Sequence, residues 1–135
     1  MYAIKAEITD PRARALELPH QKTMYGGKKI TAGDIIYVFA SENEGGSGLV
    51  AKGIVISATA TRKRPGIERQ TPRVSVSIRR TALAKRPLGR KELKPHDRWN
   101  DGRPETELNF KFYRQATNKI VGVSAETAAF LEGHF

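Results

Sequence analysis

Basic side chains gather in one part of the sequence, residues 62–98. Thirteen lysines and arginines there face three acidic residues, and this excess equals the formal net charge of the whole chain, +10. Such a local excess attracts polyanions and gains free energy when their counterions are released. We therefore predict a nucleic-acid-binding face, with a solvated surface that only aids solubility as the alternative. The cations that we expect to contact nucleic acid are Arg62, Lys63, Arg64, Arg69, Arg73, Arg79 and Arg80.

A second group of residues has the chemistry to read a nucleobase. The loop Trp99-Asn100-Asp101-Gly102 holds the single tryptophan, and residues 112–119 place amide, hydroxyl and cationic groups beside aromatic rings. Reading an unpaired base requires a flat face for stacking and donors and acceptors for the base edge. This composition favours a base-binding site, and the alternative is an aromatic core beside a polar loop.

Signatures of catalysis and of cofactor binding are few. The glycine-rich residues 45–48 are not followed by the Gly-Lys-Ser/Thr of a phosphate loop, so we predict a hairpin tip there. The histidines His20, His96 and His134 are scattered, and their spacing predicts no metal site. The chain has no cysteine, which excludes disulfides and thiolate zinc sites and suits a reducing cytoplasm. We expect neither a metal nor a cofactor.

Size and composition are those of a globular domain. The chain has 135 residues, of which 39% are hydrophobic and 28% charged, so we expect one domain over residues 1–135. Residues 1–7 lack the basic and apolar regions of a signal peptide, and no apolar run approaches the roughly 20 residues that span a bilayer. We expect a cytoplasmic protein without a membrane partner, and the oligomeric state stays open.

The pattern of apolar residues predicts five or six strands with helices at the ends. The predicted strands are residues 2–8, 35–40, 49–60, 73–83, 108–112 and 120–123, and the predicted helical segments are residues 12–18, 90–93 and a terminal helix capped by Ser124. Residues 19–27 and 61–72 are expected to be loops. Gly53 lies inside a strand, which indicates a bulge or a close backbone approach. This order predicts an α+β protein with a small mixed-sheet β-barrel, short peripheral helices and a C-terminal helix.

The order of these segments resembles the PUA-like superfamily, and within it the EVE and ASCH branches. The resemblance rests on a short first strand, then Gly33-Asp34 before the strand at residues 35–40, then Gly48-Leu49-Val50-Ala51-Lys52-Gly53-Ile54-Val55, the alternating basic strand, and Ile120-Val121-Gly122-Val123-Ser124 before the closing helix. It implies a five- or six-stranded barrel with a pocket that holds nucleic acid, often through a modified base. By position, the resemblance places Phe39, Ser41, Trp99, Asn100, Gln115 and Asn118 at this pocket.

The resemblance to ASCH domains supplies an alternative function. Some ASCH domains look like small amidohydrolases that use a Lys-Thr pair and a glutamate, and Lys22 and Thr23 occupy the matching place, with Glu42 or Glu68 as the acid. A desolvated lysine could deprotonate the threonine for attack on the amide of an acylated nucleoside. A protein-interaction adaptor that meets an acidic partner is a third possibility. We favour a nucleic-acid-binding module over an enzyme, with RNA or a modified or flipped base favoured over unmodified duplex DNA.

Overall fold

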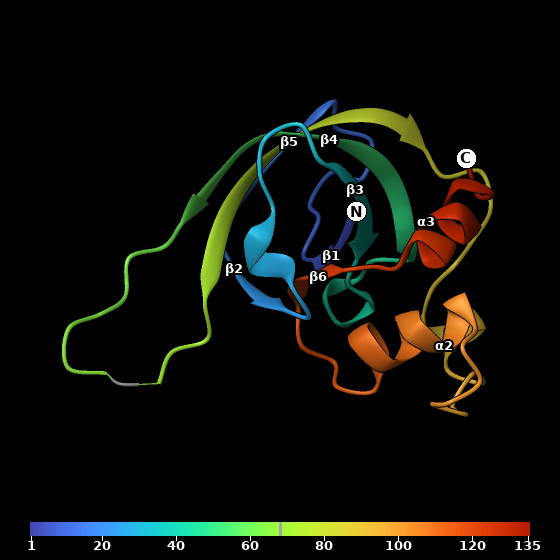
Figure 1. Ribbon diagram of the computed structural model, residues 1–135. Helices are drawn as coiled ribbons and strands as arrows, with labels where there is room; N and C mark the ends of the chain where they lie inside the picture. The colour runs from blue at the N-terminus through green and yellow to red at the C-terminus, as the bar shows by residue number, and fades with distance from the viewer. Residues whose placement is uncertain (68) are drawn as a thin grey trace.

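The structure is a computed structural model that describes residues 1–67 and 69–135. Within these residues, six strands close into a barrel in the order β1-β3-β4-β5-β2-β6 (Figure 1). The strands are β1 (Tyr2–Ala6), β2 (Ala15–Met24), β3 (Ile35–Ala40), β4 (Gly48–Ala60), β5 (Arg73–Leu83) and β6 (Lys119–Gly122). The pairs β1–β3 and β2–β6 are parallel and the other four pairs are antiparallel. The predicted α+β mixed-sheet barrel is confirmed.

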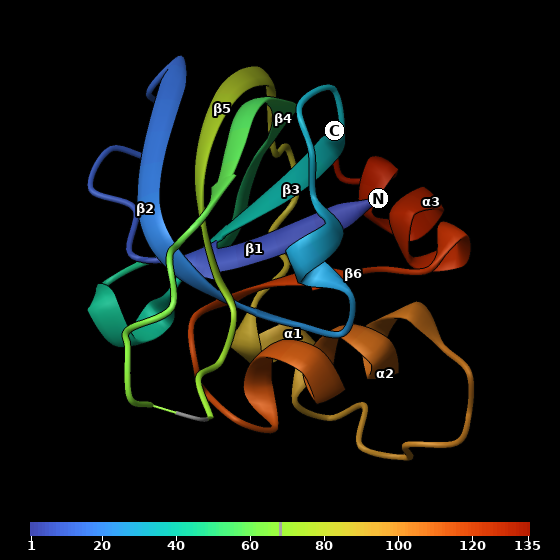
Figure 2. The same ribbon diagram turned by 60° about the vertical axis from the view of Figure 1, so that its left-hand side comes forward.

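Short helices cover one side of this barrel. They are α1 (Arg90–Leu93), α2 (Pro104–Leu108), the π-helical turn η3 (Asn109–Tyr113) and α3 (Ala125–Glu132), with 3₁₀ turns η1 (Gly27–Lys29) and η2 (Glu42–Glu44) in the loops. Figure 2 shows α1 and α2 below the barrel and α3 beside the N-terminus. No helix of the described residues is long and apolar enough to cross a membrane.

Two apolar cores result, one on each face of β1, β3 and β6. Ile4, Val38 and Ile120 point into the barrel and meet the inward residues of β4 and β5. Phe39 and Val121 point outward and pack against the helices. Because both faces of β3 are covered, its sequence is a continuous apolar run rather than an alternating one.

The predictions for the β3–β4–β5 part of the barrel are confirmed. Strands β3 and β5 have the predicted bounds, and β3 and β4 form an antiparallel hairpin across the glycine-rich segment. A Cβ atom on Gly53 would lie 2.5 Å from the carbonyl oxygen of Arg79, so this glycine permits the close approach that the sequence indicated. Gly33 has a positive φ of 94°, and the Asp34 carboxylate accepts a hydrogen bond from the amide of Thr31 at 2.8 Å, as expected for a Gly-Asp turn.

The helix predicted at residues 12–18 and the loop predicted at residues 19–27 are wrong. Strand β2 occupies Ala15–Met24 and pairs with β5, with a register shift between Leu18 and Gln21. Pro19 lacks an amide hydrogen, and it lies inside this irregularity, where no ladder bond is lost. The irregularity interrupts the apolar alternation, which is why the sequence pattern did not predict a strand.

The strand predicted at residues 108–112 is also wrong, because this segment belongs to the continuous helical run α2–η3. Pro104 occupies the first turn of α2, where a missing amide hydrogen costs nothing. Leu108 and Phe112 are buried four residues apart, which is helical spacing, and the same residues also fit an alternating strand. The tertiary packing decides between the two.

The terminal helix is confirmed with the cap that the sequence predicted. The Ser124 hydroxyl oxygen accepts a hydrogen bond from the Thr127 amide at 3.1 Å. The same hydroxyl donates to the Glu107 carboxylate at 2.6 Å, and the Thr127 hydroxyl donates to it at 2.9 Å. Glu107 therefore ties α2 to the first turn of α3.

Candidate nucleic-acid interface

The segment between β4 and β5 leaves the barrel as a projecting arm, which we define as residues 61–72. The last ladder pair before it is Ala60 with Val74, and Figure 1 shows the arm standing clear of the barrel at the left. Its base is fixed by the Thr61 amide, which donates to the Arg73 carbonyl at 2.8 Å, and by the Thr23 amide, which donates to the Pro72 carbonyl at 3.0 Å. The arm is thus anchored to both β5 and β2.

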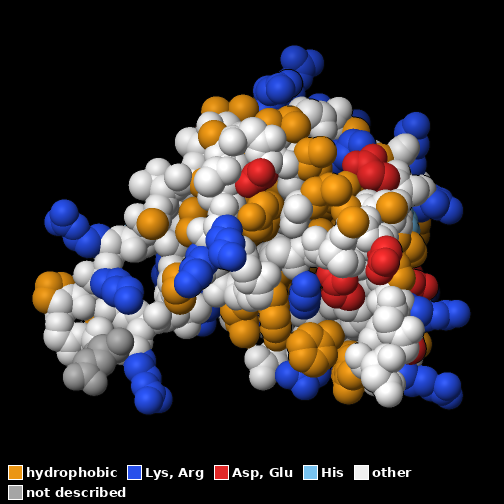
Figure 3. Space-filling model, in the orientation of Figure 1, with side chains coloured by type: hydrophobic (Ala, Val, Ile, Leu, Met, Phe, Trp, Pro, Cys, Tyr) orange, Lys and Arg blue, Asp and Glu red, His pale blue; other side chains and the backbone are white. Residues whose placement is uncertain are grey.

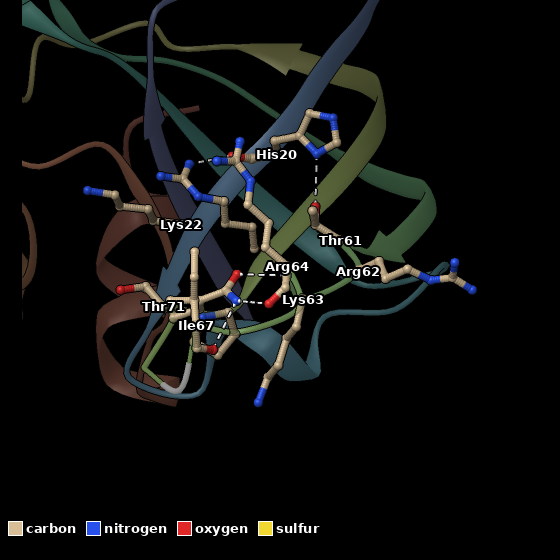
Figure 4. Close-up of a pocket in the computed structure, with 11 residues that line it drawn as sticks. His20, Lys22, Thr61, Arg62, Lys63, Arg64, Ile67 and Thr71 are labelled. Carbon is tan, nitrogen blue, oxygen red and sulfur yellow. Dashed lines mark hydrogen bonds between the residues drawn. The ribbon is translucent and has the colours of Figure 1, made fainter.

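A hollow of about 580 Å³ lies between this arm and β2, and we call it the basic hollow. Its lining, shown in Figure 4, consists of His20, Lys22, Thr61, Arg62, Lys63, Arg64, Ile67, Gln70, Thr71, Pro72 and Arg73. Five of these residues are cations, and no carboxylate is found among the described residues that line it. The concave shape and the single sign of charge together concentrate positive potential here.

His20, on β2, lines the basic hollow and contacts the base of the arm. Its backbone has a positive φ of 52°, a conformation that costs about 1–3 kcal/mol for a non-glycine residue. Its amide donates to the Ser75 hydroxyl at 2.9 Å, and its Nδ1 lies 2.9 Å from the Thr61 hydroxyl. The Arg73 guanidinium donates to the His20 carbonyl at 2.8 Å. Sequence reasoning missed His20, because the irregularity of β2 that orients it leaves only Pro19 as a signal.

The predicted phosphate-binding cations are divided between two parts of the structure. Arg62, Lys63, Arg64 and Arg73 line the basic hollow, whereas Arg69 is exposed elsewhere on the arm. Arg79 and Arg80 lie toward the other end of β5. Arg79 is opposite Ala15 of β2, and the Arg80 guanidinium donates to the Arg12 carbonyl at 2.8 Å. In Figure 3, lysine and arginine side chains project from the arm, and most of the visible acidic side chains lie on the opposite side.

A smaller polar hollow of about 270 Å³ adjoins the basic hollow, and we call it the side hollow. It shares His20, Lys22 and Arg73 with the basic hollow and adds Gln21, Glu44, Ala116, Thr117 and Asn118. The Asn118 amide donates to the Glu44 carboxylate at 3.2 Å. Amide and carboxylate groups of this kind can pair with the edge of a base.

The residues that the resemblance assigns to one pocket lie in several places. Phe39 is fully buried, with its ring centroid 5.1 Å from that of Phe112, and Ser41 is also buried. Asn118 lines the side hollow, whereas Asn100 and Gln115 are exposed.

Trp99 is 45% exposed and packs edge-on against Phe110, with 5.6 Å between their ring centroids. It lines a separate hollow of about 240 Å³ with Gly102, Arg103, Thr106, Glu107 and Phe110. The structure therefore places Asn118 in the side hollow, next to the basic hollow, and Trp99 in a separate hollow.

Two lysines are buried beneath the residues that precede β6. Lys5 and Lys119 are opposite each other in the β1–β6 pair, and both are at most 1% exposed. The Lys5 ammonium donates to the Phe112 carbonyl at 2.8 Å, and the Lys119 ammonium donates to the Gln115 carbonyl at 3.2 Å. Burial, and then the nearby charges of Lys5 and Lys22, lower the pKa of Lys119 to about 8. Sequence patterns gave no signal for this pair.

The residues of the amidohydrolase alternative do not converge among the described residues. Thr23 is buried and its hydroxyl donates to the Pro72 carbonyl at 2.8 Å, whereas Lys22, its neighbour on a strand, faces the opposite side. The Glu42 carboxylate accepts hydrogen bonds from the Tyr113 hydroxyl at 3.0 Å and from the Arg90 amide at 2.6 Å. Glu68 lies outside the described residues. A search of the described residues finds no group of three or more His, Asp or Glu that could hold a metal ion.

The comparison with solved structures shows which fold this is, although the sequence matches no protein-family model and no curated protein. The DUF55 domain of human thymocyte nuclear protein 1 is 13% identical, with a TM-score of 0.65 over 98% of this chain and 96% of that one. Human THYN1 in complex with 5-methylcytosine-containing DNA is 14% identical, with a TM-score of 0.63 over 98% and 95%. A Pseudomonas syringae protein is 16% identical, with a TM-score of 0.59 over 99% of both chains. The chain has the fold of a small PUA-like barrel.

Proposed function

We propose that this protein binds nucleic acid and holds one unpaired base where the basic hollow meets the side hollow. The observation that carries the proposal is the convergence of Lys22, Arg62, Lys63, Arg64 and Arg73 around one hollow without a described carboxylate. Phosphate contacts from lysine and arginine supply most of the affinity of such complexes. The volume of about 580 Å³ also lies in the range of about 300–1,000 Å³ that small-ligand sites occupy.

The side hollow gives this proposal its base-reading part. Gln21, Thr117 and Asn118 supply amide and hydroxyl groups beside the cations that would hold the phosphate. A structural neighbour, human THYN1, was solved with 5-methylcytosine-containing DNA, which supports a modified base as the ligand. This makes an EVE-type binding role the favoured interpretation of the resemblance over an ASCH-type hydrolase.

Single-stranded RNA is the first polymer to test, because its bases are already unpaired and need no strand opening. Affinity should fall steeply with salt, with a slope of about −0.7 in log K against log [salt] for each phosphate neutralised on a single strand. The variant Lys22→Glu with Arg64→Glu removes two cations from the hollow. We expect it to lower the affinity at least tenfold and to flatten the slope.

The matched control makes the same change of charge elsewhere. Lys91 and Arg98 are exposed and line neither hollow, so Lys91→Glu with Arg98→Glu should lower the affinity much less. Equal losses in both variants would mean that net charge alone drives binding. If the protein binds no RNA or DNA even at low salt, the proposal fails and an adaptor for an acidic protein takes its place. Oligonucleotides with cytosine or 5-methylcytosine then test the modified base.

A further inference from the structure

Three aromatic rings and one guanidinium gather at the surface where β2 ends, and we call Tyr25, Trp99, Phe110 and Arg114 the aromatic cluster. Both Tyr25 and Trp99 pack on Phe110, with 5.9 Å and 5.6 Å between the ring centroids. Tyr25 is 39% exposed and Trp99 is 45% exposed. Among the described residues, no other tyrosine, tryptophan or phenylalanine is exposed to this extent. Exposed rings that share one place, unlike scattered ones, indicate a binding surface.

The geometry of this cluster leaves ring surface for a flat ligand. The planes of Tyr25 and Trp99 are inclined to that of Phe110 by 60° and 70°, and such an edge-to-face contact covers at most one face of a ring. The Arg114 Cζ atom lies 4.1 Å from the Phe110 ring centroid and 5.9 Å from that of Trp99, while Arg114 itself is exposed. A planar cation beside exposed rings suits a planar group that carries a phosphate, as a nucleotide does.

The backbone of Tyr25 is strained in the conformation that presents its ring. Its φ is 52°, as it is at His20, and no other non-glycine residue of the described chain has a positive φ. Such a conformation costs about 1–3 kcal/mol and is concentrated at ligand sites. The Tyr25 carbonyl accepts a hydrogen bond from the Gly122 amide at 3.0 Å, and a Cβ atom on Gly122 would lie 2.7 Å from that oxygen. Strand β6 thus fixes Tyr25 in place.

Two short stretches of chain join the aromatic cluster to the side hollow. Lys22 lines that hollow and precedes Tyr25 by three residues, which span at most about 11 Å. Ala116 also lines it and follows Arg114 by two residues. Figures 1 and 2 both show the end of β2 next to the helical run α2–η3. The cluster therefore continues the site where we propose that a base is held.

The charges beside the cluster favour a phosphate backbone. The hollow next to Trp99 is lined by one cation, Arg103, and by one carboxylate, Glu107. The Glu107 carboxylate is already engaged inside the protein, because it forms a salt bridge with Lys111 at 3.1 Å and accepts hydrogen bonds from α3. Arg103 and Arg114 are exposed and form no salt bridge with a described residue. Both are free to contact phosphate.

We propose that the aromatic cluster is a second nucleotide subsite, on which further bases of a bound single strand stack while one base occupies the side hollow. This inference rests on the proposed function, since the strand is held first at the basic hollow. It makes the preferred ligand a single strand of several nucleotides, because an isolated nucleotide reaches only one subsite and the bases of a duplex stack on one another. Single-strand sites on small barrels cover about 4–16 nucleotides and use aromatic stacking of this kind.

Removing bases while keeping every phosphate tests the second subsite. A decanucleotide RNA is compared with the same strand in which one central base remains and the other positions are abasic. The wild-type protein should bind the complete strand about fivefold more tightly or better, the effect of one base–aromatic stack. Only the complete strand should quench the emission of Trp99, the single tryptophan.

Variants then locate the effect in the cluster. Trp99→Ala and Tyr25→Ala should each lower the affinity ratio of the two strands toward one, whereas Trp99→Phe keeps a ring and should retain most of the ratio. Ile56→Ala is the matched control, because Ile56 is 52% exposed on β4 and lines none of these hollows. The quenching comparison uses the wild-type protein alone, so it decides the matter even where a variant fails to fold.

The outcomes separate this inference from the proposed function. If both strands bind equally and Lys22→Glu with Arg64→Glu weakens both, or if Trp99→Ala keeps the wild-type ratio, the second subsite is overturned and the proposed function stands. If neither strand binds even at low salt, the proposed function itself has failed. Aromatic surfaces also bind proline-rich peptides, so quenching of Trp99 by such a peptide and by neither strand would overturn the subsite as well.

Discussion

The buried pair Lys5 and Lys119 links the electrostatics of single residues to the stability of the barrel. Both ammonium groups donate to backbone carbonyls, yet burial lowers the pKa of each below that of a free lysine. A lysine charged in the folded state at neutral pH therefore costs free energy that its hydrogen bond offsets only in part. This cost disappears when the lysine loses its proton.

The stability of the protein should rise with pH in the range where Lys119 titrates. Its pKa is about 8 when folded and 10.5 when unfolded, so the unfolded chain binds more protons between these values. The free energy of unfolding, relative to that of Lys119→Met, should increase by about 1–2 kcal/mol between pH 7 and pH 9.5. Urea unfolding at several pH values measures this difference. Lys91→Met is the control, because Lys91 is exposed, and parallel curves for the wild type and Lys119→Met would contradict the prediction.

The exposure of Trp99 places it outside both apolar cores. Because its main described ring contact is edge-on with Phe110, Trp99→Ala should cost about 1 kcal/mol of stability, well below the 3–5 kcal/mol of a core aromatic. Its role in base stacking stays a prediction. Since Trp99 lines a different hollow from Lys22, a mononucleotide should leave its fluorescence unchanged and a longer single strand should quench it. Equal quenching by the mononucleotide and by the longer strand would mean that Trp99 contacts the base held at the basic hollow, which would contradict the prediction.

At the scale of the elements, the β4–β5 pair depends on one position without a side chain. Gly53→Ala would place a methyl group 2.5 Å from the Arg79 carbonyl oxygen. The paired strands β4 and β5 fix the positions of both atoms. We expect this variant to lose about 2–3 kcal/mol of stability, the range of an overpacked core. Ser57→Ala, on an exposed position of the same strand, should change stability by less than about 0.5 kcal/mol. Denaturant unfolding of the two variants makes the comparison.

The elements differ in how far the sequence alone could predict them. Strands β3 and β5 follow directly from an apolar run and from the alternation of Val74, Val76 and Ile78, because each pattern reports which faces are buried. Strand β2 does not, since its irregularity around His20 breaks the alternation. The sequence pattern also fails for the α2–η3 run, because Leu108 and Phe112 fit the helical period and the alternating period of a strand at once. The local pattern of apolar residues predicts a helix or a strand only where one of the two periods fits and the other does not.

The same distinction applies to the candidate site. The charge of the arm is visible in the sequence, because its cations are consecutive or nearly so. Lys22 and His20 reach the basic hollow only through the pairing of β2 with β5, and Lys5 meets Lys119 only through the pairing of β1 with β6. Contacts between distant segments of this kind leave no local signal. Trp99 and Asn118 line different hollows, with α2 and η3 between them in the chain.

At the scale of the whole molecule, the barrel closes through a short seam. Strands β2 and β6 pair in parallel at two positions, Thr23 with Ile120 and Met24 with Val121, whereas β4 and β5 pair at nine. Few ladder bonds make local opening easier there. In native-state hydrogen exchange, amides at the end of β2 and in β6 should exchange faster than central amides of β4 and β5. Equal rates would mean that the barrel opens only by global unfolding.

The arm also gives the molecule a place where the chain can be cut without loss of the barrel. All six strands lie outside residues 61–72, and proteolytic enzymes that cleave after lysine or arginine would meet Arg62 and Lys63 on an exposed segment. Exposed loop tips are the preferred sites of such nicking and tolerate new chain ends. A nicked molecule would keep its folded barrel, because the two fragments remain joined through the β4–β5 pairing and the rest of the sheet, while the lining of the basic hollow would lose its continuous chain. If the proposed function is correct, limited proteolysis should therefore lower the affinity for nucleic acid and leave the fold standing.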